Sequence, residues 1–150
     1  MGNFGLKVNR FYEIFVEQNG YVMVLEGLKN TLLIAVIGLI IGIVIGTLIA
    51  AIRTIPQYKV LPRVLNGICS VYVGIFRGTP MVVQLLVFYY VMLPLMGVKM
   101  TGVQVSMIVF GLNSAAYISE IMRSGIMSVD SGQMEAGRAV GLSYGTTMMK

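Results

Sequence analysis

The sequence predicts an all-α integral membrane protein, and three observations lead to this fold class. First, 57% of the 150 residues are hydrophobic and only 11% are charged, against roughly 25% in a typical soluble domain. Second, the apolar residues form long uncharged runs, and basic residues lie between the runs. Third, the mean hydropathy is +0.84. A soluble core of this size could not bury so much apolar surface, so part of it must face lipid.

The composition also disfavours several classes of function. The net charge is +5, but the basic residues form no cluster, so we expect them to mark cytoplasmic loops and not a nucleic-acid site. With no histidine and one cysteine, Cys69, the chain offers no metal site or disulfide framework. Cys69 lies in an apolar stretch and is expected to act as a small apolar residue. A P-loop signature is also absent, so we expect neither ATP hydrolysis nor catalytic residues in this chain.

The predicted organisation is one transmembrane domain over residues 1–150 with a lead-in segment over residues 1–27. The lead-in mixes acidic, basic, aromatic and aliphatic residues. Two interpretations stay open for it: an amphipathic helix lying at the membrane interface, or a flexible tail.

The first predicted membrane crossing covers residues 31–52, which are 22 residues without a charge. A helix of that length spans ~33 Å, enough for the hydrocarbon core. Asn30 or Thr31 is expected to cap its start, while Arg53 and Pro56 mark its end.

Small residues recur every four positions in this crossing, at Gly38, Gly42 and Gly46. Such a stripe lets another helix backbone approach closely. We interpret it as a packing face against helices of this protein or of a partner, with substrate contact as the less favoured alternative.

The loop after this crossing contains Arg53, Lys59 and Arg63 and no acidic residue. The positive-inside rule therefore places the loop in the cytoplasm and the N-terminus outside.

The second predicted crossing covers residues 64–98 and is broken near 77–80, where the sequence reads Arg77-Gly78-Thr79-Pro80. Residues 64–76 are too short to cross alone, whereas residues 81–98 are 18 uncharged residues and can just cross. We expect Pro80 in the first turn of the restarting helix, with Thr79 as its cap.

The third predicted crossing covers residues 101–122; Glu120 lies near its inner end, and Arg123 follows directly after it. These two side chains are three residues apart, so they share a helix face and could form an ion pair. Three crossings from an outside start leave the following segment, residues 128–150, in the cytoplasm.

A short helix of about nine residues is predicted in this cytoplasmic segment. Ser131 is its expected N-cap, Gln133 could reach back towards Asp130, and Gly141 is placed to end the helix. Because the helix presents small residues and Glu135, one interpretation is that it docks into a groove on another protein. The alternative is an ordinary loop helix lying on the membrane.

The order Glu135-Ala136-Gly137, three residues, then Gly141 resembles the EAA loop of ABC importer permeases. That loop usually reads E-A-A, three residues, G, nine residues, I, one residue, L-P; here Gly137 replaces the second alanine, and nine residues follow Gly141. Further segments resemble the polar amino-acid (histidine, glutamine, arginine, opine) branch of these permeases. They are Asn30-Thr31-Leu32, Phe76-Arg77-Gly78-Thr79-Pro80, Asn113-Ser114-Ala115-Ala116-Tyr117-Ile118-Ser119-Glu120-Ile121 followed by Arg123, and Gly132-Gln133.

The resemblance implies a permease-type helix bundle in the cytoplasmic (inner) membrane of a prokaryote. Permeases of this branch usually have five crossings, so we expect a C-terminally truncated chain with about two crossings missing and an incomplete loop. The implied partners are a second permease subunit, identical or different, a cytoplasmic ATPase dimer that binds ATP-Mg, and an external amino-acid-binding protein. No cofactor is expected in this chain. The implied ATPase-coupling residues are Gly132, Gln133, Glu135, Ala136, Gly137 and Gly141.

Polar residues at membrane depth are costly and are candidate site residues by default. The candidates for the substrate path are Thr79, Gln84, Asn113 and Ser114. Gln84 and Asn113 could hydrogen-bond a zwitterionic substrate or each other. Arg77, Glu120 and Arg123 are interpreted as structural or gating residues, with Arg77 and Glu120 expected to satisfy one another or nearby helix ends.

Two other functions are weighed against this one. A fragment of a secondary transporter or channel would need an ion relay deep in the membrane, but the predicted helices contain no His or Asp and one acidic residue near a helix end. A small membrane-anchoring or assembly protein, complete at 150 residues, is the second alternative.

Overall fold

The computed structural model describes residues 2–56 and 58–149, so Gln57 in the predicted cytoplasmic loop lies outside the described residues. All regular elements in the described part are helices, which confirms the predicted all-α class. In chain order they are α1 (Gly2–Tyr12), the π-helix η1 (Glu13–Glu17), α2 (Gly20–Thr54), α3 (Val60–Gly78), α4 (Met81–Val87), the π-helix η2 (Phe88–Met92), α5 (Leu93–Leu95), α6 (Gly102–Met127), α7 (Ser131–Ala139) and α8 (Tyr144–Met149).

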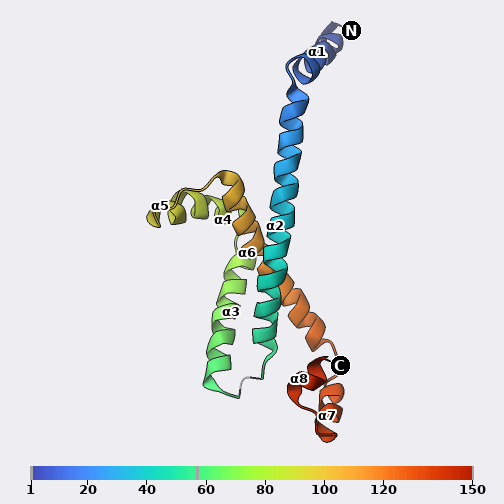
Figure 1. The fold of residues 1–150 in the computed structure, drawn as a ribbon, viewed down its shortest axis with the longest axis vertical. Helices are drawn as coiled ribbons and strands as arrows, with labels where there is room; N and C mark the ends of the chain where they lie inside the picture. Colours follow the sequence, from blue (N-terminus) through green and yellow to red (C-terminus); the bar gives the residue numbers. More distant parts are fainter. Residues whose placement is uncertain (1, 57, 150) are drawn as a thin grey trace.

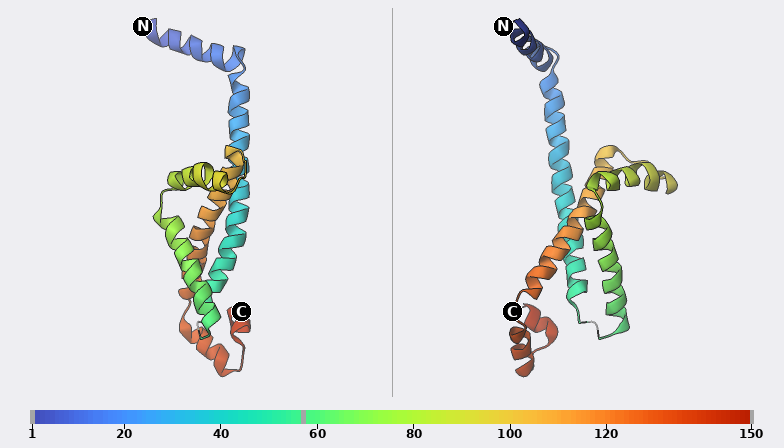
Figure 2. Two further views of the ribbon diagram at one scale, coloured as in Figure 1. Left: turned by 90° about the vertical axis from the view of Figure 1, so that its left-hand side faces the viewer. Right: turned by 180° about the vertical axis from the view of Figure 1, so that it is seen from behind.

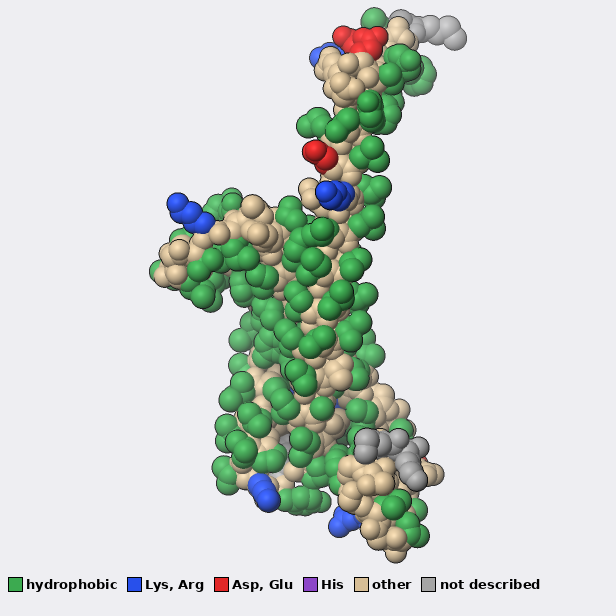
Figure 3. Space-filling model, viewed as in Figure 1, with side chains coloured by type: hydrophobic (Ala, Val, Ile, Leu, Met, Phe, Trp, Pro, Cys, Tyr) green, Lys and Arg blue, Asp and Glu red, His purple; other side chains and the backbone are tan. Residues whose placement is uncertain are grey.

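Helices α2, α3 and α6 form the bundle, and each is long and apolar enough to cross a membrane. Figure 1 shows α3 and α6 beside the lower half of α2, while the upper half of α2 and helix α1 project away from the bundle. Hydrophobic side chains cover most of the visible face of the bundle (Figure 3). An uncharged outer surface of this kind suits a lipid environment.

Helix α2 is longer than the uncharged run predicts, because it begins at Gly20 and not near Thr31. The Thr31 hydroxyl donates to the Gly27 carbonyl (2.9 Å) inside the helix, so neither Asn30 nor Thr31 caps its start. A helix continues through charged residues as readily as through apolar ones, and only the lipid core excludes them. Before it, Asn19 adopts a positive φ of 56°, and Figure 2 shows α1 turned sharply from the axis of α2 there.

The glycine stripe of α2 lies against α6, and Gly38, Gly42 and Gly46 are all buried. A Cβ added at Gly42 would lie 2.7 Å from the Ser114 Cβ, and one at Gly46 would lie 2.9 Å from the Ile118 Cβ. The two backbones therefore approach too closely for any larger side chain at these positions.

Helix α3 also begins earlier than predicted, at Val60, and contains Pro62 in its first turn, where a missing backbone N–H is harmless. Its 19 residues are long and apolar enough to cross a membrane, so the helix before the break is longer than the stretch of residues 64–76 considered in the sequence. After the break, residues Met81–Leu95 form a shorter apolar helical stretch. Figure 1 shows this stretch leaving the upper end of α3 sideways.

A small apolar core joins the three long helices. Ile49 of α2, Val73 of α3 and Ala116 of α6 are buried together, and the partly buried side chains packed on them are Ile45, Cys69, Tyr72 and Phe76. The Tyr72 hydroxyl donates to the Leu112 carbonyl of α6 (2.5 Å). The site residues described next lie at the two ends of this core.

Candidate substrate path and coupling helix

Two buried primary amides lie at the break between α3 and α4. Gln84 and Asn113 are each only 7% exposed. The Gln84 Nε2 donates to the carbonyl oxygens of Phe76 (2.9 Å) and Thr79 (3.0 Å). The Asn113 Nδ2 donates to the same Phe76 carbonyl (3.2 Å) and to the Gln84 Oε1 (3.1 Å). The amides thus bond to each other, one of the two arrangements expected, and satisfy carbonyl groups that the end of α3 leaves without helical partners.

Thr79 belongs to this cluster, but it caps the helix before the break and not the one after it. Its hydroxyl donates to the Ile75 carbonyl of α3 (2.8 Å) and accepts from Gln84 Nε2 (2.9 Å). The residue before α4 is Pro80, which provides no side-chain cap. The cap prediction is therefore corrected: the backbone after Thr79 is extended, as the residue before a proline favours, so its hydroxyl reaches back to α3.

Ser114 is separated from the other predicted path residues. Its Cβ is the nearest atom to a Cβ placed on Gly42 of α2. The structure therefore brings Thr79, Gln84 and Asn113 together at the break and places Ser114 in the seam between α2 and α6.

A charged cluster surrounds Glu120 of α6. One carboxylate oxygen accepts from the Arg53 guanidinium at 2.6 Å, and the other accepts from Arg123 at 2.6 Å. The Glu120–Arg123 pair expected from their spacing is thus present. Arg77 lies farther away, with Nη1 3.9 Å from the carboxylate, so Glu120 is satisfied chiefly by Arg53 and Arg123.

The sequence did not lead us to predict Arg53 as a site residue. Its positive charge was used only to place the following loop on the cytoplasmic side of the membrane. A signal for it existed in the sequence: Arg53 follows Gly46 by seven residues and Gly42 by eleven, so it continues the face of α2 that carries the glycine stripe. Its side chain is 12% exposed. Long-range pairing with Glu120 follows once that face packs on α6.

Residues of its own segment cap helix α7 at both ends. Its N-cap is Asp130, whose carboxylate accepts from the Gly132 backbone N–H (2.7 Å), and not Ser131 as predicted. At the other end Gly141 has φ +80°. The Gly141 N–H donates to the Arg138 carbonyl (3.0 Å) and the Leu142 N–H to the Gly137 carbonyl (2.9 Å). This pair of bonds is a Schellman motif, which favours glycine at the left-handed position.

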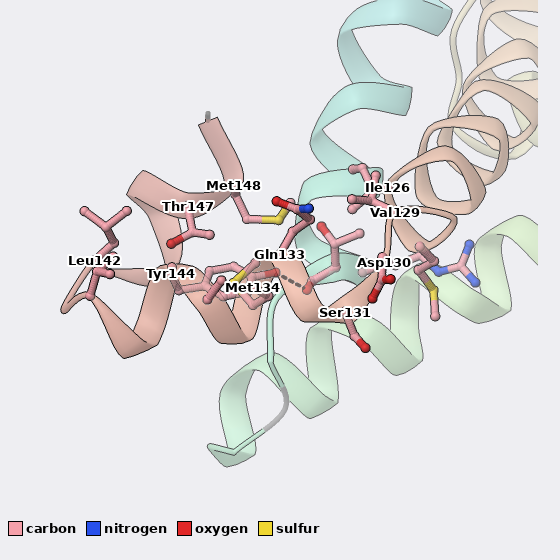
Figure 4. A pocket seen from close by; sticks show the side chains of 16 residues that line it. Ile126, Val129, Asp130, Ser131, Gln133, Met134, Leu142, Tyr144, Thr147 and Met148 are labelled. Carbon is pink, nitrogen blue, oxygen red and sulfur yellow. Dashed lines mark hydrogen bonds between the residues drawn. The ribbon is translucent and has the colours of Figure 1, made fainter.

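Helices α7 and α8 fold back so that they face the C-terminal ends of α2 and α6. A cavity of ≈ 1120 Å³ lies among these four elements, and Figure 4 shows Met134, Tyr144 and Thr147 from the two short helices around it. The Tyr144 hydroxyl donates to the Thr54 carbonyl at the end of α2 (2.8 Å). Gly137 is buried against Thr147, and a Cβ on Gly137 would lie 2.6 Å from the Thr147 Cγ2.

The other predicted coupling residues keep exposed surface, although Gln133 and Ala136 also line this cavity. Gly132, Gln133, Glu135 and Ala136 are exposed. Within residues 2–56 and 58–149, the Glu135 carboxylate makes no ion pair. The same described residues contain no group of three or more His, Cys, Asp or Glu that could hold a metal ion.

Comparison with known proteins identifies the family. The model of the binding-protein-dependent transport system inner membrane component matches residues 42–150. The chain belongs to this family. Its members are transport components of the inner membrane and not enzymes.

Curated relatives of the same family agree with this placement. The arginine transport system permease protein ArtQ of Bacillus subtilis is 39% identical over 125 residues, covering 83% of this chain and 55% of that protein. The putative glutamine transport system permease protein GlnP of Rickettsia bellii is 40% identical over 119 residues, covering 79% and 52%. The chain thus spans about half the length of these relatives.

A solved structure gives the same result for the fold. The crystal structure of an amino acid ABC transporter with histidines matches with a TM-score of 0.74 and 31% identity, over 89% of this chain and 60% of that one. The predicted permease-type helix bundle is therefore confirmed for the part of the fold that the chain contains.

Proposed function

We propose that this chain forms part of the membrane-spanning permease subunit of an ATP-driven importer of polar amino acids. Family membership supports transport, and similar proteins are named for arginine, glutamine and L-cystine transport. The observation that carries the proposal is α7, a capped helix with an exposed Glu135 held below the inner ends of α2 and α6. A nine-residue helix is marginal by itself, so its tethering favours a docking role.

In this proposal the N-terminus lies outside the cell, and α7 and α8 lie in the cytoplasm. The charges support this orientation, because Arg53, Lys59 and Arg63 all flank the connection from α2 to α3. Figure 1 shows this connection at the same end of the bundle as α7 and α8, and α1 at the opposite end. The lipid bilayer would surround the part of the bundle between these two ends.

The implied partners follow from the division of labour in such importers. A cytoplasmic ATPase dimer binds ATP-Mg and receives α7, a second permease subunit completes the path, and an external binding protein delivers the amino acid. On our proposal the coupling surface is made of exposed α7 residues together with the turn at Gly141.

We further propose that the break between α3 and α4 borders the substrate path. A helix interruption at membrane depth is tolerated where it is buried in protein or lines a water-filled cavity. The amides of Gln84 and Asn113 hold the interruption in shape, while Thr79 and Arg77 remain exposed beside it. Ser114 would serve the helix seam in this arrangement.

A charge reversal on α7 tests the proposal. The complete importer that contains this chain is reconstituted in proteoliposomes with its ATPase, second permease and binding protein, and uptake of a panel of labelled amino acids is measured with the ATPase rate. We expect Glu135→Lys to lower uptake by roughly 10-fold or more, because a charge-assisted contact contributes about 1.5–3 kcal/mol. Glu26→Lys, an exposed charge reversal in α2, is the matched control and should stay within about 2-fold of wild type.

Two results would contradict the proposal. Uptake of no amino acid by the wild-type importer, with a working ATPase, would overturn the substrate class. Equal uptake and ATPase stimulation by wild type and Glu135→Lys would overturn the coupling role of α7.

A further inference from the structure

The Arg77 guanidinium has hydrogen-bond donors that the described protein does not use. Both oxygens of Glu120 already accept at 2.6 Å from Arg53 and Arg123. Arg77 stands 3.9 Å from that carboxylate, beyond hydrogen-bond distance. Within residues 2–56 and 58–149 no hydrogen bond leaves its guanidinium, and 42% of its side chain is exposed. An arginine with unused donors at membrane depth marks a functional site by default.

The same guanidinium is held in a defined position by one face of α6. Asn113, Tyr117 and Glu120 follow one another at spacings of four and three residues, so they share a face. Asn113 fixes the backbone next to Arg77 by donating to the Phe76 carbonyl (3.2 Å). The guanidinium stacks over the Tyr117 ring, and the ring centroid lies 5.4 Å from the Arg77 Cζ.

The charges around Glu120 are unbalanced in a way that favours an anion. Three guanidiniums, those of Arg53, Arg77 and Arg123, surround one carboxylate. In the described part of the chain no other acidic side chain pairs with any of them. Unpaired positive charge in a low-dielectric setting is costly, and a second negative group beside Arg77 would lower that cost.

We propose that Arg77, resting on Tyr117, binds the α-carboxylate of the transported amino acid. This inference rests on the proposed function. A guanidinium presents a planar fork that matches the two oxygens of a carboxylate, and stacking on an aromatic face leaves the N–H groups at its edge free. Arg77 lies in the last turn of α3, directly before the break that borders the proposed path and two residues before Thr79.

A lipid phosphate is an oxyanion of related chemistry, and the test must separate it from a substrate carboxylate. The complete permease–ATPase complex is placed in nanodiscs of phosphatidylcholine without the binding protein. Binding of labelled L-arginine and L-glutamine is measured, together with binding of the corresponding α-amides, which lack the carboxylate. Co-purification of the ATPase and the elution volume on gel filtration report whether each variant assembles.

We expect Arg77→Gln to weaken binding of the two amino acids by roughly 10- to 150-fold, as the loss of a hydrogen bond between charged groups predicts, and to leave binding of the α-amides unchanged. Arg77→Lys keeps the positive charge but lacks the planar guanidinium fork, so it should weaken amino-acid binding less than Arg77→Gln does. Tyr117→Leu should weaken amino-acid binding by roughly 2- to 5-fold through loss of the cation–π contact. Arg63→Gln removes an exposed arginine from the same helix and is the control; it should leave binding of the amino acids and of the α-amides unchanged.

Equal losses for amino acids and α-amides in Arg77→Gln would overturn the inference, because the effect would then be structural. Unchanged amino-acid binding in both Arg77 variants would overturn it too. An effect of Arg77→Gln that appears only when phosphatidylglycerol is added would assign the residue to a lipid phosphate instead. Failure of the wild-type importer to take up or bind any amino acid is a different result, since it removes the proposed function itself.

Discussion

The close contact between α2 and α6 makes a sharp prediction for Gly46→Ala. A Cβ at Gly46 would lie 2.9 Å from both the Cβ and Cγ2 of Ile118 and 3.0 Å from the Ala115 carbonyl oxygen. The Ile118 Cβ and the carbonyl move only with the helix backbone, so the two helices must separate. Overpacking of this kind costs about 1–3 kcal/mol, whereas replacing a helical glycine by alanine gains about 0.5–1 kcal/mol from helix propensity.

Gly74→Ala in α3 is the matched control, because a Cβ there would meet nothing within 4 Å. The propensity gain is common to both variants and cancels in their difference, which leaves the overpacking cost of about 1–3 kcal/mol. The overpacking cost of Gly38→Ala should lie between those of the other two variants, since the atom nearest to its new Cβ would be the Phe110 Cβ at 3.3 Å. Thermal unfolding of the purified importer in one detergent, followed by fluorescence-detected gel filtration, should rank Gly74→Ala highest, then Gly38→Ala, then Gly46→Ala. Equal midpoints for Gly46→Ala and Gly74→Ala would refute the close packing.

Two further predictions concern the end of the bundle that lies beside α7 and α8. Glu120→Gln removes the charge that two arginines share at 2.6 Å, so it should lower stability by about 2 kcal/mol; an unchanged midpoint in the same assay would contradict the cluster. Gly137→Ala restores the residue usual in the EAA loop, yet its Cβ would lie 2.6 Å from the Thr147 Cγ2 and 2.7 Å from its Oγ1. We therefore expect Gly137→Ala to reduce ATP-driven uptake and Thr147→Ala to restore it, and failure of the second change to rescue the first would contradict the contact between α7 and α8.

The sequence correctly predicted those features of the fold that depend on residues close together in the chain. The all-α class, the position of the break near Pro80 and the Glu120–Arg123 pair all depend on residues a few positions apart. The start of α2 was misplaced, because absence of charge reports where lipid begins and not where a helix begins. Helix α2 continues through Glu26 and Lys29 to Gly20, where Asn19 in the left-handed region changes the chain direction.

Features that depend on which faces meet could not be predicted from one sequence. Ser114 and Asn113 are neighbours in the chain, but successive residues of a helix point about 100° apart. One therefore packs on Gly42, and the other bonds to Gln84. The pairing of Arg53 with Glu120 joins residues 67 positions apart. The spacing from the glycine stripe indicates the face of α2 on which Arg53 lies, but it does not identify Glu120 as the partner.

The contacts of α7 and α8 with the C-terminal ends of α2 and α6 also explain why helix packing and ATPase coupling are expected to be linked. Helix α7 is joined to α6 through a turn in which the Ser128 N–H donates to the Ser124 carbonyl (3.0 Å). The same short segment is tied to α2 by the bond from the Tyr144 hydroxyl to the Thr54 carbonyl (2.8 Å). A force on α7 therefore acts on both helices of the glycine seam at once. Among the described elements, α2 and α6 share by far the most extensive interface. They are therefore expected to resist separation and to move together as one rigid unit. Their polar links to α3 and α4 are few, and several lie at the break beside Arg77, so relative movement would be concentrated where we place the substrate carboxylate.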